Sequence, residues 1–311
     1  MSTIVFFCIP AYGHTNPTLG VVRELAARGH KVVYYSYDTM RKPIEAAGAA
    51  FVSCNAYDAE QRLSPKDGER LGRDLAFSTQ VLVDTTLALD NAILSDMRAL
   101  APDCIVADSM ALWGKLIAKK LDIPFVSSTT TFAFNRYSAK IMKQSPAQLF
   151  GMLVSMPKIG REIKRLQAAG YPVKSVLDII QNDENLDTIV YTSPEFQPCA
   201  DTFPAAHYAF VGPSIRPAEM RMEKSAQPLV YISLGTVVND QPAFYQQCVA
   251  ALADGPCRVI LSIGEQVKPA ALGTLPGNVE VHAHVDQIAV LQIADVFLTH
   301  CGMNSASEAM Y

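Results

Sequence analysis

Residues able to bind an anion gather near the end of the chain. The stretch 295–311, DVFLTHCGMNSASEAMY, passes from an apolar strand through a turn at Gly302 into a helix. A helix N-terminus presents unpaired backbone N–H groups and a partial positive charge, so it favours a phosphate. His300 adds a donor at the strand tip. The pattern predicts an anion site, although an ordinary capped turn would account for Asn304 and Ser305 equally well.

A second pair of residues points to proton transfer. His14, in PAYGHTNP, follows the apolar run 4–10, and Asp108 lies at the end of the strand predicted in the segment 104–109. An imidazole titrates near neutrality and can take a proton from a hydroxyl, while a carboxylate can orient it and stabilise its charged form. Taken alone, His14 is also compatible with a helix cap or a surface position, and Asp108 with a helix N-cap.

The elements that must position these residues alternate between strands and helices. Runs that are apolar on both faces, alternating with helical patterns, are typical of parallel strands covered by helices. In the first part of the chain the predicted strands are 4–10, 31–36, 104–109, 124–129 and 188–193, with helices ending at Gly29 and spanning 111–121. We therefore expect residues 1–212 to form one doubly wound domain, in which ligands collect at the carboxyl ends of the strands.

A boundary follows this domain. Residues 213–228 hold three prolines and five charged residues and lack apolar periodicity, which is typical of a linker. A second series of strands is predicted at 229–236, 258–264, 279–285 and 295–300. Residues 229–311 should thus form a second α/β domain.

Composition limits the protein class. The chain has 311 residues, of which 50% are hydrophobic and 18% charged, so a globular protein with two domains is expected. The net charge of −4 gives no general reason to bind nucleic acid or an anionic membrane. Seven cysteines without CxxC pairs favour a reducing compartment, and no apolar run approaches the ~20 residues of a membrane span. We expect a cytoplasmic protein.

The sequence also resembles a known family. HCGMNSASEA is similar to the donor-binding signature of the UDP-glycosyltransferases, in particular the bacterial macrolide-type group of this inverting family. The resemblance extends in collinear order to the segments at 11–32, 102–126, 230–236 and 284–291. It implies a GT-B arrangement, with the acceptor bound by the first domain and a nucleotide sugar by the second.

The resemblance assigns roles to residues of the second domain. It makes His300 a diphosphate ligand, gives Glu308 the ribose, and places the SLGT loop beside the phosphates and the sugar. His284 falls where relatives carry an aromatic residue that stacks on uracil, and Asp286 replaces a common proline. These two departures weaken the prediction of a uridine base, whereas they leave the prediction of a phosphate site unchanged. The full donor set expected from the resemblance is Ser233, Gly235, Thr236, His284, Val285, Gln287, His300, Gly302, Asn304, Ser305 and Glu308.

In the first domain the resemblance makes His14 the base and Asp108 its support. The expected reaction moves a hexose, with UDP-glucose the favoured donor, to a hydroxyl of a small lipophilic acceptor with inversion. The chain shows no P-loop, HExxH motif or DxD carboxylate pair, so neither a metal nor another cofactor is expected. An aromatic and Met-rich stretch suits an adaptable apolar pocket, and the predicted pocket residues are Met110, Trp113, Phe132 and Phe134.

Two other functions stay open at this point. A nucleotide-sugar epimerase would share the fold and the phosphate site, and a non-catalytic binding or auxiliary protein would keep the nucleotide site without turnover. Relatives continue beyond the equivalent of Tyr311, so the resemblance further implies a fragment in which the second domain is incomplete and apolar sheet surface stays exposed.

Overall fold

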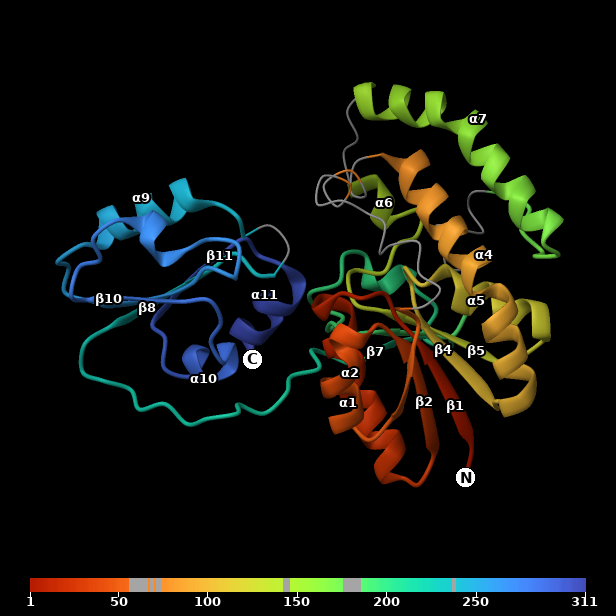
Figure 1. Ribbon diagram of the computed structural model, residues 1–311, viewed down its shortest axis with the longest axis horizontal. Helices are drawn as coiled ribbons and strands as arrows, with labels where there is room; N and C mark the ends of the chain where they lie inside the picture. Colours follow the sequence, from red (N-terminus) through yellow and green to blue (C-terminus); the bar gives the residue numbers. More distant parts are fainter. Residues whose placement is uncertain (56–66, 68–69, 71–73, 142–145, 176–185, 237–238) are drawn as a thin grey trace. The chain divides into compact units, whose positions relative to one another are not determined.

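The computed structural model describes residues 1–55, 67, 70, 74–141, 146–175, 186–236 and 239–311. Its internal contacts divide the chain into two compact units, Met1–Ser214 and Ile215–Tyr311. Residues 213–228 contain neither helix nor strand. Each unit is an α/β structure built on one parallel sheet (Figure 1).

The first unit holds a seven-stranded sheet in the order β3-β2-β1-β4-β5-β6-β7, with every neighbouring pair parallel. Its strands are β1 (Thr3–Phe7), β2 (Lys31–Ser36), β3 (Ala50–Ser53), β4 (Cys104–Asp108), β5 (Phe125–Thr129), β6 (Thr188–Val190) and β7 (Tyr208–Phe210). Its α-helices are α1 (Tyr12–Ala27), α2 (Arg41–Ala46), α4 (Leu75–Leu100), α5 (Leu112–Leu121), α6 (Ser138–Ile141) and α7 (Pro146–Ala168), with short 3-10 turns η1 (Asp38–Met40) and η4 (Ala200–Thr202). The strand order reverses beside β1, which is where doubly wound sheets place ligands.

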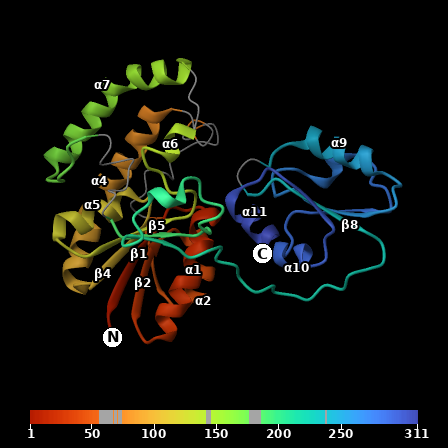
Figure 2. The same cartoon turned by 180° about the vertical axis from the view of Figure 1, so that it is seen from behind.

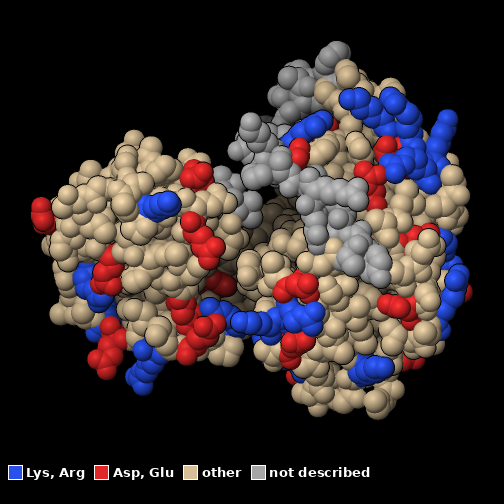
Figure 3. All heavy atoms as spheres, in the orientation of Figure 1, with Lys and Arg blue, Asp and Glu red and all other residues tan. Residues whose placement is uncertain are grey.

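Alternating side chains of the strands divide the core of this unit into two layers. Phe6 and Tyr34 pack with α1 and α2 on one face, whereas Phe7 and Tyr35 pack with α4 and α5 on the other. Helix α7 in turn packs on α4, as both views show (Figures 1 and 2). Lys and Arg gather over the α7 end of the unit on the face drawn in Figure 3.

The second unit holds a four-stranded parallel sheet in the order β10-β9-β8-β11. Its elements are β8 (Leu229–Ser233), α9 (Pro242–Leu252), β9 (Arg258–Ser262), η5 (Pro269–Leu272), β10 (Val279–His282), α10 (Gln287–Leu291), β11 (Val296–Thr299) and α11 (Met303–Met310). Separate apolar clusters lie on the two faces, one with α9 and one with α10. On the edge strand β11, Val296 and Leu298 are 55% and 42% exposed.

Several predicted strands are longer than the observed ones. The first ends at Phe7, although the apolar run continues to residue 10. The strand predicted over 229–236 ends at Ser233, and Gly235, with φ of 76°, turns the chain out of the sheet. Strands β3 and β7 and the long helix α4 were not predicted.

Candidate active site

His14 and Asp108 meet at the carboxyl edge of the first sheet. His14 is the third residue of α1, which follows β1, and Asp108 is the last residue of β4, the neighbour of β1. Their Nδ1 and Oδ1 atoms lie 3.0 Å apart. The Asp108 side chain is fully buried, and the His14 side chain is 21% exposed.

The contact with Asp108 changes the pKa of His14. Burial lowers the pKa of His14, but the hydrogen bond and the charge of Asp108 together outweigh it, so the pKa ends above the usual value for histidine. With Nδ1–H donating to the carboxylate, the lone pair of Nε2 is left to receive a proton. This arrangement can take a proton from a hydroxyl and stabilise the resulting imidazolium.

A third residue at this edge was missed from the sequence. Thr130 directly follows β5, and its Oγ1 lies 3.1 Å from the same His14 Nδ1. The run Thr129, Thr130 and Thr131 after a buried strand is the signal that marks the position.

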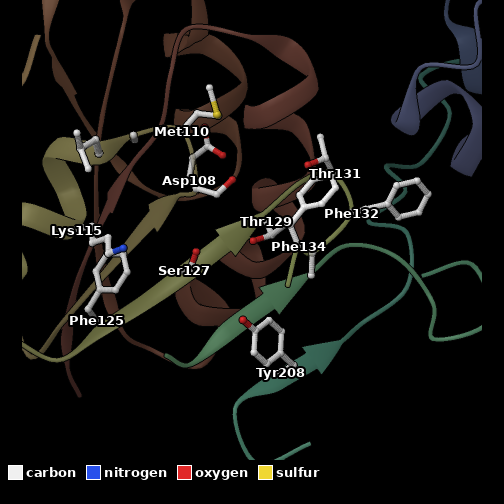
Figure 4. Close-up of a pocket in the computed structure, with 14 residues that line it drawn as sticks. Asp108, Met110, Lys115, Phe125, Ser127, Thr129, Thr131, Phe132, Phe134 and Tyr208 are labelled. Atoms are coloured by element: carbon white, nitrogen blue, oxygen red, sulfur yellow. The ribbon is translucent and has the colours of Figure 1, made fainter. Parts of the chain in front are cut away.

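A cavity lies beside Asp108. Three of the four residues predicted to form the acceptor pocket line this cavity. Met110, Phe132 and Phe134 line it, with polar groups of β5 at Ser127 and Thr129 (Figure 4). Met110 and Phe134 are 45% and 46% exposed, so apolar surface faces solvent here. The cavity, which Asp108 also lines, therefore offers apolar and polar contacts to a small molecule.

Trp113, the fourth predicted pocket residue, lies elsewhere. It is 1% exposed and packs in the core between α5 and the sheet. The helical periodicity of α5 turns this side chain inward, whereas Met110 stands in the loop before the helix.

In the second unit, the pairing of β11 with β8 brings the two predicted donor loops together. Thr299 lies opposite Ser233, so His300 and Gly235 follow at the same sheet edge. A Cβ added to Gly235 would come within 2.6 Å of His300 Cε1, and one added to Gly302 within 2.6 Å of His300 Nε2. The exposed imidazole thus lies against two glycines that leave room for it.

The anion site predicted at the following helix has suitable geometry. Helix α11 begins after Gly302, its N-cap residue, which makes no side-chain capping hydrogen bond. Asn304 is half-buried and Ser305 is buried within that turn. The helix dipole and N–H groups therefore point toward the loop that carries His300.

Gln287 connects the remaining donor candidates. Its Nε2 donates to Glu308 Oε2 at 2.5 Å and to Ser305 Oγ at 3.3 Å, and its Oε1 accepts from the Tyr231 hydroxyl at 3.0 Å. Burial raises the pKa of Glu308 above its usual value, against the opposing effect of this hydrogen bond. Gln287 thus joins β8, α10 and α11, which the sequence did not reveal.

The other predicted donor residues are placed less closely. Thr236 is exposed, Val285 packs against the α10 cluster, and the His284 side chain is 65% exposed and 3.6 Å from Glu265.

Asp286 replaces the proline expected at its position, and its side chain is 5% exposed. It binds the segment before β8, because its carboxylate accepts from Arg216 Nη2 at 2.7 Å and from the Glu219 N–H at 2.6 Å.

The described part of the chain contains neither a metal-ligand cluster nor a membrane-spanning helix. No group of three or more His, Cys, Asp or Glu side chains there could hold a metal ion. All seven cysteines fall within the described ranges and are free thiols. No described helix has the length and apolar character needed to cross a bilayer.

The chain is similar to known glycosyltransferases. Residues 207–311 match the family model "UDP-glucoronosyl and UDP-glucosyl transferase". The chain is 31% identical to "Uncharacterized UDP-glucosyltransferase YojK" of Bacillus subtilis, over all of this chain and 78% of that protein. It is 32% identical to demethyllactenocin mycarosyltransferase of Streptomyces fradiae, over all of this chain and 69% of that protein.

Among solved structures, the glycotransferase of kitacinnamycin superposes with a TM-score of 0.80 at 28% identity, over 99% of this chain and 78% of that one. Its likeness confirms the predicted GT-B fold class. Together with the relatives, it shows that this chain is a glycosyltransferase and belongs to the UDP-glucoronosyl and UDP-glucosyl transferase family.

Proposed function

We propose that the enzyme moves a hexose from a UDP-sugar, with UDP-glucose the favoured donor, to a hydroxyl of a small hydrophobic acceptor. The observation that carries this proposal is the His14–Asp108 pair, whose Asp108 also lines a cavity with Met110, Phe132 and Phe134. The acceptor hydroxyl would lie at His14, with its apolar body against Met110, Phe132 and Phe134.

The proposed chemistry is a single displacement. His14 Nε2 takes the hydroxyl proton while the acceptor oxygen forms a bond to the anomeric carbon. The bond from that carbon to the diphosphate breaks, UDP departs with the electron pair, and the configuration inverts. Asp108 stabilises the imidazolium formed at His14.

The donor would be held by the second unit. His300 and the first turn of α11 supply donors and positive potential for the diphosphate, and this preorganised field stabilises the charge that develops on UDP. Glu308 and Gln287 would receive the ribose hydroxyls. We infer that no metal is needed, because His300 and the first turn of α11 can stabilise the negative charge of the departing UDP.

The test is incubation of the purified chain with UDP-glucose, with and without a panel of flavonoids and macrolides, and with and without EDTA. Acceptor mass gain of one hexose with release of UDP, insensitive to EDTA, supports the proposal. UDP release or sugar isomerisation without acceptor gain indicates epimerase chemistry, and binding without turnover indicates an auxiliary protein.

His14→Ala tests the base directly. We expect it to abolish transfer while the affinity for UDP stays within about a few-fold, since base and nucleotide belong to different units. His207→Ala is the matched control: His207 also pairs with an aspartate, Asp187, at 2.9 Å, but outside the site. Transfer by the His14 variant at the normal rate would remove His14 from this role.

A further inference from the structure

The His14 imidazole has two oxygen partners on one nitrogen. Asp108 Oδ1 lies 3.0 Å from Nδ1 and Thr130 Oγ1 lies 3.1 Å from it. The Thr130 residue is 3% exposed. Solvent hardly reaches this hydroxyl, so water competes little with its contact to the ring.

The contact follows from the sheet order. Strands β1, β4 and β5 are consecutive neighbours in the sheet, and His14, Asp108 and Thr130 follow or end these three strands in that order. Parallel strands bring their carboxyl ends to one edge, so three segments far apart in the chain deliver one polar group each. Thr130 directly follows the last residue of β5, so the end of that strand places it at this edge.

The direction of the hydrogen bonds follows from the carboxylate. An ionised carboxylate only accepts, so Nδ1 carries the proton when it faces Asp108. The hydroxyl at the same nitrogen must then accept a share of that N–H as well. We propose that Thr130 is a positioning residue that, with Asp108, holds the proton on Nδ1 and keeps Nε2 free to receive the proton of the acceptor hydroxyl.

This role rests on the proposed function of His14 as the base. An accepting hydroxyl stabilises the imidazolium more than the neutral ring, because the N–H is more polar in the charged form. Thr130 therefore makes His14 a stronger base and stabilises the charge formed during transfer. A threonine that donated to Nδ1 would do the reverse, because it would favour the neutral ring with its proton on Nε2.

The test compares Thr130→Val, which removes the hydroxyl with little change in shape, with Thr130→Ser, which keeps it. Thr86→Val is the control: this buried threonine of α4 also loses a hydrogen bond, from Oγ1 to the Leu82 carbonyl at 2.7 Å, but lies outside the site. The first readout is the His14 pKa and tautomer by NMR of histidine-labelled protein, assigned with His14→Ala. The second is the pH dependence of kcat and of KM for UDP-glucose.

We expect Thr130→Val to lower the His14 pKa, to move the acidic limb of the rate profile to lower pH and to reduce kcat by about tenfold, the effect of one net hydrogen bond. Thr130→Ser should restore all three, and Thr86→Val should change none. An unchanged or raised His14 pKa in Thr130→Val overturns the proposal. So does a rise in KM for UDP-glucose with an unmoved pH profile, which would mean that Thr130 contacts the donor.

The NMR titration separates this proposal from the proposed function. A lowered His14 pKa in Thr130→Val together with full activity of His14→Ala would refute the base and leave the Thr130 contact standing. The reverse pair of results would refute Thr130 alone.

Discussion

Replacing Asp108 by Asn tests how much of the activity depends on one buried charge. Asn keeps an oxygen that can accept from His14 Nδ1–H, so the change removes charge with little change in shape. In the structure the two side chains are 3.0 Å apart and Asp108 is fully buried. The charge therefore acts on His14 with little screening by water.

The expected magnitude follows from that geometry. Two unit charges about 4 Å apart attract by roughly 4 kcal/mol at an effective dielectric of about 20. In the proposed mechanism the imidazolium forms as the hydroxyl proton is taken, so most of this attraction would be lost from the transition state. At about 1.4 kcal/mol for each factor of ten, kcat should fall on the order of 10³-fold.

The pH dependence should change as well. In the native protein the hydrogen bond and charge of Asp108 raise the pKa of His14 against the effect of burial. In Asp108→Asn the charge is lost and burial remains, so the pKa falls and the acidic limb of the kcat/KM profile moves to lower pH.

The assay is the initial rate of UDP release with saturating UDP-glucose and acceptor, measured across pH. Thermal unfolding of each variant is measured as a check on folding. Asp187→Asn is the control, since its side chain is 65% exposed and pairs with His207 away from the site. It should leave the rate unchanged. A loss in Asp108→Asn below tenfold, or an acidic limb that does not move, would refute the electrostatic coupling.

The remaining predictions concern the second unit and stability. His300→Ala should weaken UDP binding by about 1.5–3 kcal/mol, typical of a hydrogen bond to a charged group, and equal calorimetric affinity would place the phosphate site elsewhere. Gly235→Ala should weaken UDP binding as well, because the added Cβ would come within 2.6 Å of the His300 ring and position 235 has φ of 76°. An unchanged UDP affinity would show that the position of the His300 ring does not matter for binding. Asp286→Asn should lower the free energy of unfolding by about 1–2 kcal/mol in urea titrations at pH 7, since the carboxylate accepts from Arg216 and two backbone N–H groups, and no loss would make that contact incidental. Because the pKa of His14 is raised, the stability it contributes is fully present below about pH 6.5 and disappears as pH rises through its folded value, so His14→Asn should lower Tm more at pH 5.5 than at pH 9.

The sequence by itself determined the local elements and the chemistry attached to their ends. The apolar runs predicted strands β1, β2, β4 and β5 because both faces of a parallel sheet are buried, and such strands need no alternation. The position of His14 and Asp108 just beyond two of them predicted a shared edge. The family resemblance added the donor loops of the second unit.

Only the tertiary structure decided which groups meet. Thr130 looked like any residue of a polar loop, and its contact with His14 exists because β5 lies next to β4 in the sheet. Gln287 reaches Glu308 and Tyr231 because β8 and α11 lie beside α10, a juxtaposition that spacing along the chain does not encode. Trp113 shows the converse. Its type suits a pocket, but the phase of α5 turns it into the core, since a helix buries one face whatever the chemistry of the residue there.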